Sequence, residues 1–268
     1  MLVDTHCHLT SAGLVERIDE VLAAAHAAGV HRFILVAVER ADAEAALRLM
    51  RTHDELYLVA GIHPHEAGRC NVEDVAGLAA LVRGEGPAAG LESRIVGLGE
   101  TGLDFFYDFA TPEAQEAVFR AHLELASEVG RPIVIHARES EGRVCEILGE
   151  YPQLAGRVVF HCFSGDTEIA RRGLDLGCYF SFTGVVTFKK AGTIRASAQF
   201  VPGDRIMLET DAPYLSPEPM RKVRPNEPAL LVHTARFLAD IRNEDYSAFA
   251  VQTTANAERF FGLPEGRS

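Results

Sequence analysis

Residues 94–136 read RIVGLGETGLDFFYDFATPEAQEAVFRAHLELASEVGRPIVIH, and the order of patterns in this stretch decides the fold. Two short apolar runs, Arg94–Glu100 and Pro132–His136, flank a segment with alanine, leucine and charged residues at helical spacing. A threonine–proline pair is typical of the start of a helix, and Gly130 is typical of its end. The stretch therefore predicts a strand, a helix over Pro112–Val129 and a second strand.

The same alternation runs along the rest of the chain. Its apolar runs are rich in Val, Ile, Leu and Phe with little alternation, which is typical of parallel strands buried on both faces. The other predicted strands are Leu2–His6, Arg32–Val38, Tyr57–His63, Arg157–Cys162, Cys178–Phe182 and Arg205–Glu209. The other predicted helices are Leu14–Ala28, Ala41–Thr52, Ser140–Glu150 and Thr167–Leu176. Eight strands alternating with helices favour an α/β fold, a (β/α)₈ TIM-type barrel rather than an open sheet.

Length and composition agree with one such barrel. The chain has 268 residues, and a barrel of this kind takes about 250. We interpret Gly84–Gly90 and Ser216–Pro228 as barrel loops, so we expect a single domain over residues 1–268. No stretch approaches the ~20 apolar residues of a membrane span, and the first residues do not resemble a signal peptide. The five cysteines form no CxxC pair, so we expect a cytoplasmic protein without membrane association.

The formal net charge of −12 excludes one class of nucleic-acid-binding protein. Proteins that coat DNA without sequence preference neutralise many phosphates and are usually basic. An enzyme that grips one chain end remains compatible with this charge, because bound metal ions supply positive charge inside the site.

Histidines and acids recur where the predicted strands end. His6 and His8 follow the first strand and His63 and His65 the third; Glu100 ends the fourth, His136 the fifth and His161 the sixth, and Asp211 follows the eighth. Active sites of such barrels are built at the carboxyl ends of the strands, so we expect these side chains to share one mouth. A single histidine at a strand end is more often structural, but six of them with two acids are hard to assign to structure.

These residue types indicate a metal centre. His6 and His8 are two residues apart and face the same side of an extended strand, so both rings can reach one ion. Imidazole and carboxylate ligands without cysteine suit a catalytic divalent ion. Six ligands are too many for one tetrahedral ion with an open position, whereas two ions that share a carboxylate account for the number. For His63 and His65 we favour substrate contact over metal ligation.

The ordered set of motifs resembles one family. The segments are Asp4-Thr5-His6-Cys7-His8-Leu9, Gly61-Ile62-His63-Pro64-His65, Gly99-Glu100-Thr101-Gly102-Leu103-Asp104, Ile135-His136-Ala137-Arg138, His161-Cys162-Phe163-Ser164-Gly165, Glu209-Thr210-Asp211-Ala212-Pro213-Tyr214-Leu215, Asn226-Glu227-Pro228 and Asn256-Ala257. Over essentially its whole length the chain resembles TatD-type deoxyribonucleases of the metallo-dependent hydrolase superfamily.

The resemblance implies a role for each of these residues. One ion would be held by His6, His8, Glu100 and Asp211, and the other by Glu100, His136 and His161, with Glu100 as the bridge. The catalytic residues would be Asp211, which orients and deprotonates the attacking water, Glu100, and His63 at the scissile phosphate. His65, Arg138, Arg221 and Arg224 would lie near the substrate. The identity of the two ions stays open among Mg²⁺, Mn²⁺ and Zn²⁺.

Three positions depart from the family's pattern. The loop at residues 219–225, before Asn226, is longer and carries several basic residues, which leaves open which of them meets phosphate. His122 stands where glutamine is common, at a helical position that we interpret as structural. Thr101 follows Glu100 where a branched apolar residue is common.

Three classes of function follow. The first is a metal-dependent hydrolase that cleaves DNA by means of a metal-activated water, exonucleolytically on single strands, with no obligate protein partner. The second is an amidohydrolase or lactonase acting on a small molecule, since one fold serves many reactions. Glu100 favours the first, because many amidohydrolases have a modified lysine as the bridge, and the lysines here are Lys189, Lys190 and Lys222. The third, a non-catalytic interaction protein, conflicts with the complete ligand set.

Overall fold

The computed structural model describes residues 1–70 and 72–264, which fall into two compact units. Unit 1 comprises residues 1–35, 162–171 and 180–264, and unit 2 comprises residues 36–70, 72–161 and 172–179. The strands belong to an eight-stranded sheet in which their order follows the chain, β1 to β8. Among the described residues no helix is both long enough and apolar enough to cross a bilayer.

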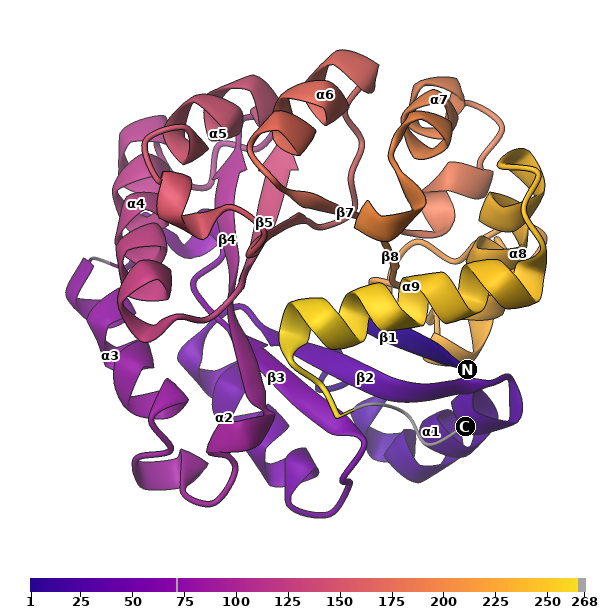
Figure 1. The fold of residues 1–268 in the computed structure, drawn as a ribbon. Coiled ribbons are helices and arrows are strands. Elements are labelled where there is room, and N and C mark those ends of the chain that lie inside the picture. Colours follow the sequence, from indigo (N-terminus) through magenta and orange to yellow (C-terminus); the bar gives the residue numbers. More distant parts are fainter. Residues whose placement is uncertain (71, 265–268) are drawn as a thin grey trace. The chain divides into compact units, whose positions relative to one another are not determined.

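Unit 1 contains two pairs of parallel strands and most of the C-terminal helices. Strand β1 (Leu2–Cys7) pairs with β2 (Val30–Ala37), and β7 (Tyr179–Phe182) pairs with β8 (Ile206–Leu208). The helices that lie in it wholly or in part are α1 (Ile18–Ala27), α6 (Thr167–Asp175), α7 (Gly192–Phe200), α8 (Leu231–Ile241) and α9 (Tyr246–Phe261). Helix α9 packs against β1 and β8, and α8 packs against α9 (Figure 1).

Unit 2 contains four consecutive strands, β3 (Leu56–Ala60), β4 (Ile95–Asp104), β5 (Ile133–Arg138) and β6 (Val158–Phe160). Its helices are α2 (Arg40–Met50), α3 (Val72–Val82), α4 (Pro112–Val129) and α5 (Glu141–Leu148). Helix α4 covers β4, and α3 packs against α4 (Figure 1). As predicted, α4 begins after Thr111, whose hydroxyl accepts a hydrogen bond from the Ala114 N–H, and ends at Gly130 with φ of 70°.

All eight predicted strands and all five predicted helices are present. The structure corrects one boundary that matters for the site, because β4 continues four residues beyond Glu100 to Asp104. The apolar pattern ends at Glu100, and glycines stand at positions 99 and 102, so the pattern of residues does not indicate the longer strand. The prediction of one domain over residues 1–268 stays a prediction.

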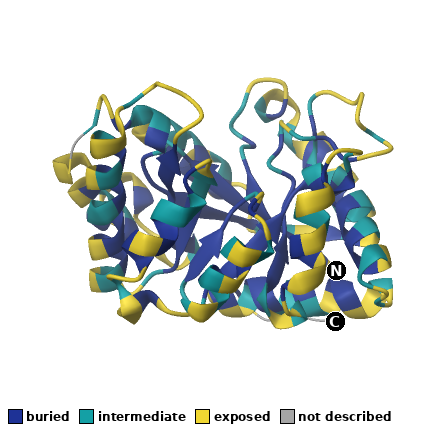
Figure 2. Cartoon of the chain, turned by 90° about the horizontal axis from the view of Figure 1, so that it is seen from above, coloured by how far each residue is buried: buried dark blue, intermediate teal, exposed yellow. Residues whose placement is uncertain are grey.

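Burial follows the strands, which are coloured as buried in Figure 2, whereas the helices each carry an exposed face. At the glycines of β4 the neighbouring strand comes close. A Cβ at Gly99, where φ is +119°, would meet the Val134 carbonyl oxygen, and one at Gly102, where φ is +135°, would meet the His136 carbonyl oxygen. Glycine at these two positions lets β4 and β5 approach on either side of Glu100.

Candidate metal centre

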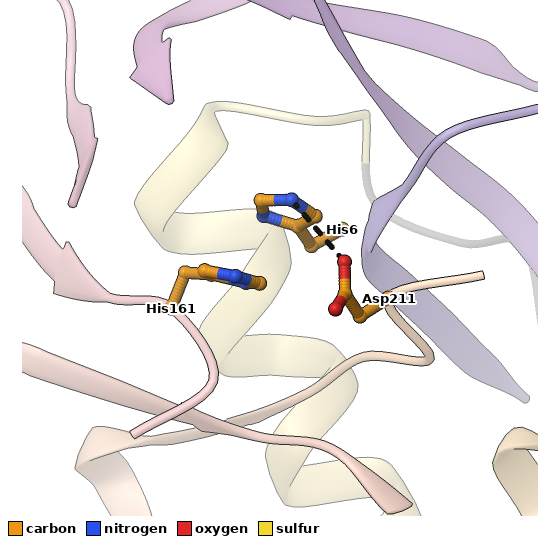
Figure 3. A group of neighbouring side chains, drawn as sticks. All are labelled: His6, His161 and Asp211. Carbon is orange, nitrogen blue, oxygen red and sulfur yellow. Dashed lines mark ion pairs between the residues drawn. The ribbon is translucent and has the colours of Figure 1, made fainter. Parts of the chain in front are cut away.

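In unit 1, three of the predicted ligands meet at the ends of β1 and β8. His6 Nε2 lies 3.3 Å from His8 Nε2. The Oδ1 of Asp211 lies 3.4 Å from His8 Nε2 and 3.9 Å from His6 Nε2. Figure 3 shows the Asp211 carboxylate facing the His6 ring. Two imidazoles and one carboxylate oxygen therefore converge within a distance that one divalent ion can span.

Asp4 fixes the backbone that carries this group. Its Oδ1 accepts hydrogen bonds from the N–H groups of Thr210 (2.9 Å) and His6 (3.4 Å), and its Oδ2 accepts one from the Thr210 hydroxyl (2.5 Å). The Asp211 N–H donates to the His6 carbonyl at 2.9 Å. Burial raises the pKa of Asp4 to about 7, although the hydrogen bonds from Thr210 and His6 oppose the rise. A wholly buried carboxyl thus ties β1 to the segment that follows β8.

In unit 2, three imidazoles point at one oxygen of Glu100. Its Oε1 lies 3.0 Å from His136 Nδ1 and 3.5 Å from the Nε2 atoms of His63 and His161. The Glu100 side chain is only 4% exposed, so this carboxylate has little contact with water. A buried carboxylate surrounded by imidazole nitrogens is the donor chemistry of a divalent-metal site.

Asp104, at the end of β4, holds the far edges of two of the rings. Its Oδ2 lies 3.0 Å from His136 Nε2 and 2.9 Å from His65 Nε2. Burial would raise the pKa of Asp104, but the hydrogen bonds from His136 and His65 and from the Tyr107 N–H hold it below its ordinary value. When His136 is neutral with its hydrogen on Nε2 toward Asp104, its Nδ1 offers a lone pair on the side of Glu100. Such carboxylate–histidine pairs orient metal ligands in many enzymes.

His63 presents a donor to the same region. The His65 N–H donates to His63 Nδ1 at 3.1 Å, which leaves the hydrogen of a neutral ring on Nε2. Burial lowers the pKa of His63, against the opposing effect of Glu100, so the ring is neutral near pH 7. Ligand atoms of His63, Glu100 and His136 also lie within 4.8 Å of one another, so these three residues could together hold an ion. The hydrogen-bonded tautomer favours donation to substrate oxygen over ligation.

The predicted basic contacts have different local roles. The Arg138 guanidinium, at the end of β5, lies over the Phe106 ring at 4.0 Å and near the Tyr107 ring at 4.9 Å. The Arg221 guanidinium lies 3.3 Å from the Phe188 ring centroid. Arg224 instead donates to the Ser216 hydroxyl (2.7 Å) and to a main-chain carbonyl (3.0 Å), so its guanidinium braces its own loop.

The sequence alone assigns no role to three residues that hold the site by hydrogen bonds, although each lies inside a quoted motif. Asp4 and Asp104 are described above, and Asn226 donates to the main-chain oxygens of Thr210 (3.0 Å) and Tyr214 (2.5 Å). Asp4 stands inside an apolar run, which marks it as unusual, but the sequence does not indicate which groups any of the three would contact. His122 is structural, as interpreted: its Nε2 accepts from the Ile62 N–H (3.1 Å), its Nδ1 lies 2.8 Å from the Val118 carbonyl, and burial lowers its pKa to about 4.

Comparison with known proteins identifies the family of this chain. The family model described as TatD related DNase matches residues 3–262. An uncharacterized metal-dependent hydrolase, YabD of Bacillus subtilis, is 35% identical over 263 residues, which are 98% of this chain and 100% of that protein. A protein of Cronobacter sakazakii named 3'-5' ssDNA/RNA exonuclease TatD is 36% identical over 264 residues, which are 97% of each chain.

Comparison with solved structures shows that the chain has the fold of TatD homologues. The crystal structure of YJJV, a TatD homologue from Escherichia coli, matches with a TM-score of 0.89 and 28% identity over 98% of both chains. A TatD-family hydrolase from Entamoeba histolytica matches with a TM-score of 0.85 at 20% identity, again over 98% of both chains, and supports the fold alone. The prediction of an α/β fold of the TIM-barrel type is confirmed. On the evidence of its motifs, its ligand groups and these matches, the chain is an enzyme of the hydrolase class and belongs to the TatD-related DNase family.

Proposed function

We propose that this chain is a metal-dependent phosphodiesterase that hydrolyses DNA, working from an end on single strands. The observation that carries the proposal is the convergence of three imidazoles on Glu100 Oε1, beside a motif set that matches the family in order. A relative 36% identical to this chain bears the name of a 3'-5' exonuclease for single-stranded DNA and RNA, which supports an unpaired nucleic acid as substrate.

The proposed centre holds two divalent ions. The ligands assigned to one ion are His6, His8, Asp211 and Glu100, and those assigned to the other are Glu100, His136 and His161. This assignment is supported by the close approach of His6, His8 and Asp211 in unit 1 and by the rings around Glu100 in unit 2. The mixed imidazole and carboxylate set fits Zn²⁺ or Mn²⁺ well and Mg²⁺ less well.

In the reaction, a water oxygen forms a bond to phosphorus while a phosphorus–oxygen bond of the backbone breaks. Bound divalent ions would supply Lewis-acid activation and neutralise charge on the phosphate. Asp211 orients the attacking water and accepts its proton as general base. The Nε2–H of neutral His63 donates to a phosphate oxygen, which stabilises the charge that develops there.

The remaining side chains would bind the substrate around this centre. Arg138 and Arg221 both lie against aromatic rings, and this restraint supports the assignment of both guanidinium groups to contact with nucleic acid. His65, hydrogen-bonded to Asp104, supports the site from behind as well as facing substrate. Arg224 stays among the proposed contacts, although its hydrogen bonds to Ser216 and Val223 leave fewer of its donors for phosphate.

The test is an assay of protein freed of metal with a chelator and then reconstituted with Mg²⁺, Mn²⁺ or Zn²⁺. End-labelled single-stranded DNA, duplex DNA and RNA are compared with a panel of amides and lactones. We expect no activity without metal and rapid shortening of single-stranded DNA with it. Full activity after verified removal of metal would refute the metal centre, and turnover confined to amides or lactones would refute the nuclease.

A further inference from the structure

We propose that residues 105–109, together with Arg138, form a platform on which bases of the single-stranded substrate stack. We call this group the aromatic platform; its rings are Phe105, Phe106, Tyr107 and Phe109. The proposal rests on the proposed nuclease function and extends it by assigning a base-binding site. These residues follow directly after the end of β4, the strand that carries Glu100.

The rings of the aromatic platform are unusually open to solvent. Their exposed fractions are 37% for Phe105, 49% for Phe106, 40% for Tyr107 and 63% for Phe109. Large aromatic residues normally bury most of their surface, and a contiguous exposed group of them commonly marks a binding site. Four such rings within five residues therefore favour a binding surface for a ligand with flat apolar faces.

Three of the four rings, Phe106, Tyr107 and Phe109, form one connected group. Phe106 and Tyr107 meet edge to face with centroids 4.7 Å apart, and Tyr107 and Phe109 lie 5.3 Å apart. The His65 ring adds contacts to Tyr107 (5.4 Å) and Phe109 (4.7 Å). Because the rings brace one another, they lose little conformational freedom when a ligand binds.

Hydrogen bonds to the main chain hold the platform in place. Asp104 Oδ1 accepts from the N–H groups of Phe106 (2.9 Å) and Tyr107 (3.0 Å). The Phe105 N–H donates to the Arg138 carbonyl at 2.9 Å. The buried Gln115 amide donates to the carbonyls of Asp104 (3.0 Å) and Ala110 (2.9 Å), so the segment is tied at both ends. The exposure of the rings therefore belongs to a fixed conformation.

The charge around the rings favours a base over other ligands. The Arg138 guanidinium covers one face of Phe106, and arginine and aromatic rings are the usual stacking partners of unpaired bases. Asp108 lies exposed in the same segment, so its charge opposes that of Arg138. A surface that carries one acidic and one basic side chain suits the uncharged face of a base better than it suits a phosphate clamp. Stacking also requires an unpaired base, which gives a physical reason for a preference for single strands.

The platform is joined to the metal-ligand group through Asp104. One oxygen of this carboxylate holds His136 and His65, and the other holds the backbone of Phe106 and Tyr107. A base stacked on these rings would therefore be positioned relative to the ligands around Glu100. The platform would act as the subsite that places a nucleotide next to the reacting phosphate.

The experiment compares a single-stranded oligonucleotide with the same strand carrying abasic residues near its end. Binding is measured with a chelator present, from the fluorescence of 2-aminopurine, which stacking quenches, and KM is measured with metal restored. For the parent enzyme we expect quenching and a KM about tenfold lower for the complete strand than for the abasic one. In Phe106→Ala and Phe109→Ala the ratio of the two KM values should fall to about twofold or less, mainly because KM for the complete strand rises.

Two further variants control the experiment. Phe109→Trp keeps a ring and should preserve both the quenching and the preference for the complete strand. Phe200→Ala removes another exposed phenylalanine, on α7, whose ring also lies under an arginine, with the Arg171 guanidinium 5.3 Å from its centroid. This control should behave as the parent does, because the residue lies outside the aromatic platform.

The outcomes separate the two proposals. If the parent cleaves single-stranded DNA but treats abasic and complete strands alike, the platform is refuted and the nuclease stands. If the parent neither binds nor cleaves nucleic acid, the proposed function itself has failed. If the Phe106 and Phe109 variants instead change only the sedimentation of the protein, the rings serve contact between copies of the chain, and the base-stacking assignment is wrong.

Discussion

The two ligand groups are each supported by one buried carboxyl, but the two carboxyls act on different parts of the chain. Asp4, which supports the backbone of His6 and Asp211, accepts hydrogen bonds from two main-chain N–H groups and from the Thr210 hydroxyl. Asp104, behind Glu100, bonds directly to the imidazoles of His136 and His65. Burial raises the pKa of Asp4 to about 7, whereas hydrogen bonds outweigh burial and lower the pKa of Asp104.

This difference shows two ways of placing a ligand. In unit 1, hydrogen bonds to Asp4 hold the backbone, and the positions of the Cα atoms then place the side chains of His6 and Asp211. In unit 2 the rings themselves are fixed, because Asp104 sets both the rotation of His136 and the nitrogen that carries its hydrogen. Replacement of Asp4 should therefore act mainly on stability, and replacement of Asp104 mainly on metal affinity.

The largest effect should come from the centre of the second group. Glu100→Ala removes the oxygen at which three imidazoles point, so we expect turnover to fall by about 10⁴-fold and metal content to drop sharply. His6→Ala removes one of three donors in the other group and should cost less. Metal analysis beside steady-state kinetics checks this. Near-normal turnover of Glu100→Ala with two ions bound would show that the carboxylate is no bridge.

Asp211→Asn tests the chemistry of the first group with little change in shape. The amide can still coordinate weakly through oxygen, but it cannot accept a proton from the attacking water. We expect a retained fold, at least one bound ion and a turnover lower by about 10³-fold, as is typical for loss of a general base. A pH–rate profile and turnover that match those of the parent enzyme would exclude this role for Asp211.

Asp104→Asn and Asp4→Asn form a matched pair that tests the comparison itself. Asp104→Asn should weaken metal binding by about 10–100-fold with a small change in stability, because the imidazoles lose a charged acceptor. Asp4→Asn should lower the free energy of unfolding by about 1–3 kcal/mol, because the Thr210 hydroxyl loses its acceptor in a buried site. Isothermal calorimetry and urea unfolding measure the two quantities. If Asp104→Asn and Asp4→Asn lost metal affinity equally and both kept the stability of the parent enzyme, the two carboxyls would not differ in the way described.

The smallest effect concerns two buried threonines. The Thr101 hydroxyl, next to Glu100, has no hydrogen-bond partner in the described part of the chain, whereas the Thr210 hydroxyl donates to Asp4 and accepts from the Ala212 N–H. Thr101→Val should raise the free energy of unfolding by about 1 kcal/mol, and Thr210→Val should lower it by about 1–3 kcal/mol. Urea titrations of both variants provide the check. A loss of stability in Thr101→Val would mean that its hydroxyl is needed.

The strands and the ligands could be predicted because their signals are local. A run such as Ile133–Ile135 is apolar in itself, and the i, i+2 spacing of His6 and His8 needs only an extended chain to be read. The ligands stand at the ends of such runs, where barrel enzymes place their chemistry. Local pattern thus gave the element order and the list of candidate ligands.

The supports could not be predicted because their partners are distant in sequence. Asp4 bonds to Thr210 across 206 positions, and Asp104 bonds to His136 across 32. The extension of β4 past Glu100 depends on glycines whose close contacts involve another strand. The exposure of Phe106 and Phe109 is likewise invisible in the sequence, where a run of aromatic residues favours burial.

The two-sided bonding of Asp104 has a thermodynamic consequence. One oxygen of the carboxylate sets a ring of the metal-ligand group, and the other sets the backbone of Phe106 and Tyr107, so two equilibria share one group. Linkage then requires reciprocity: if a divalent ion tightens the binding of an oligonucleotide by some factor, the oligonucleotide must tighten the binding of that ion by the same factor. A strand that cannot reach the rings would leave the affinity for metal as it is. The fraction of metal sites that are occupied would then show, without any cleavage, whether the end of a strand is bound on the aromatic platform.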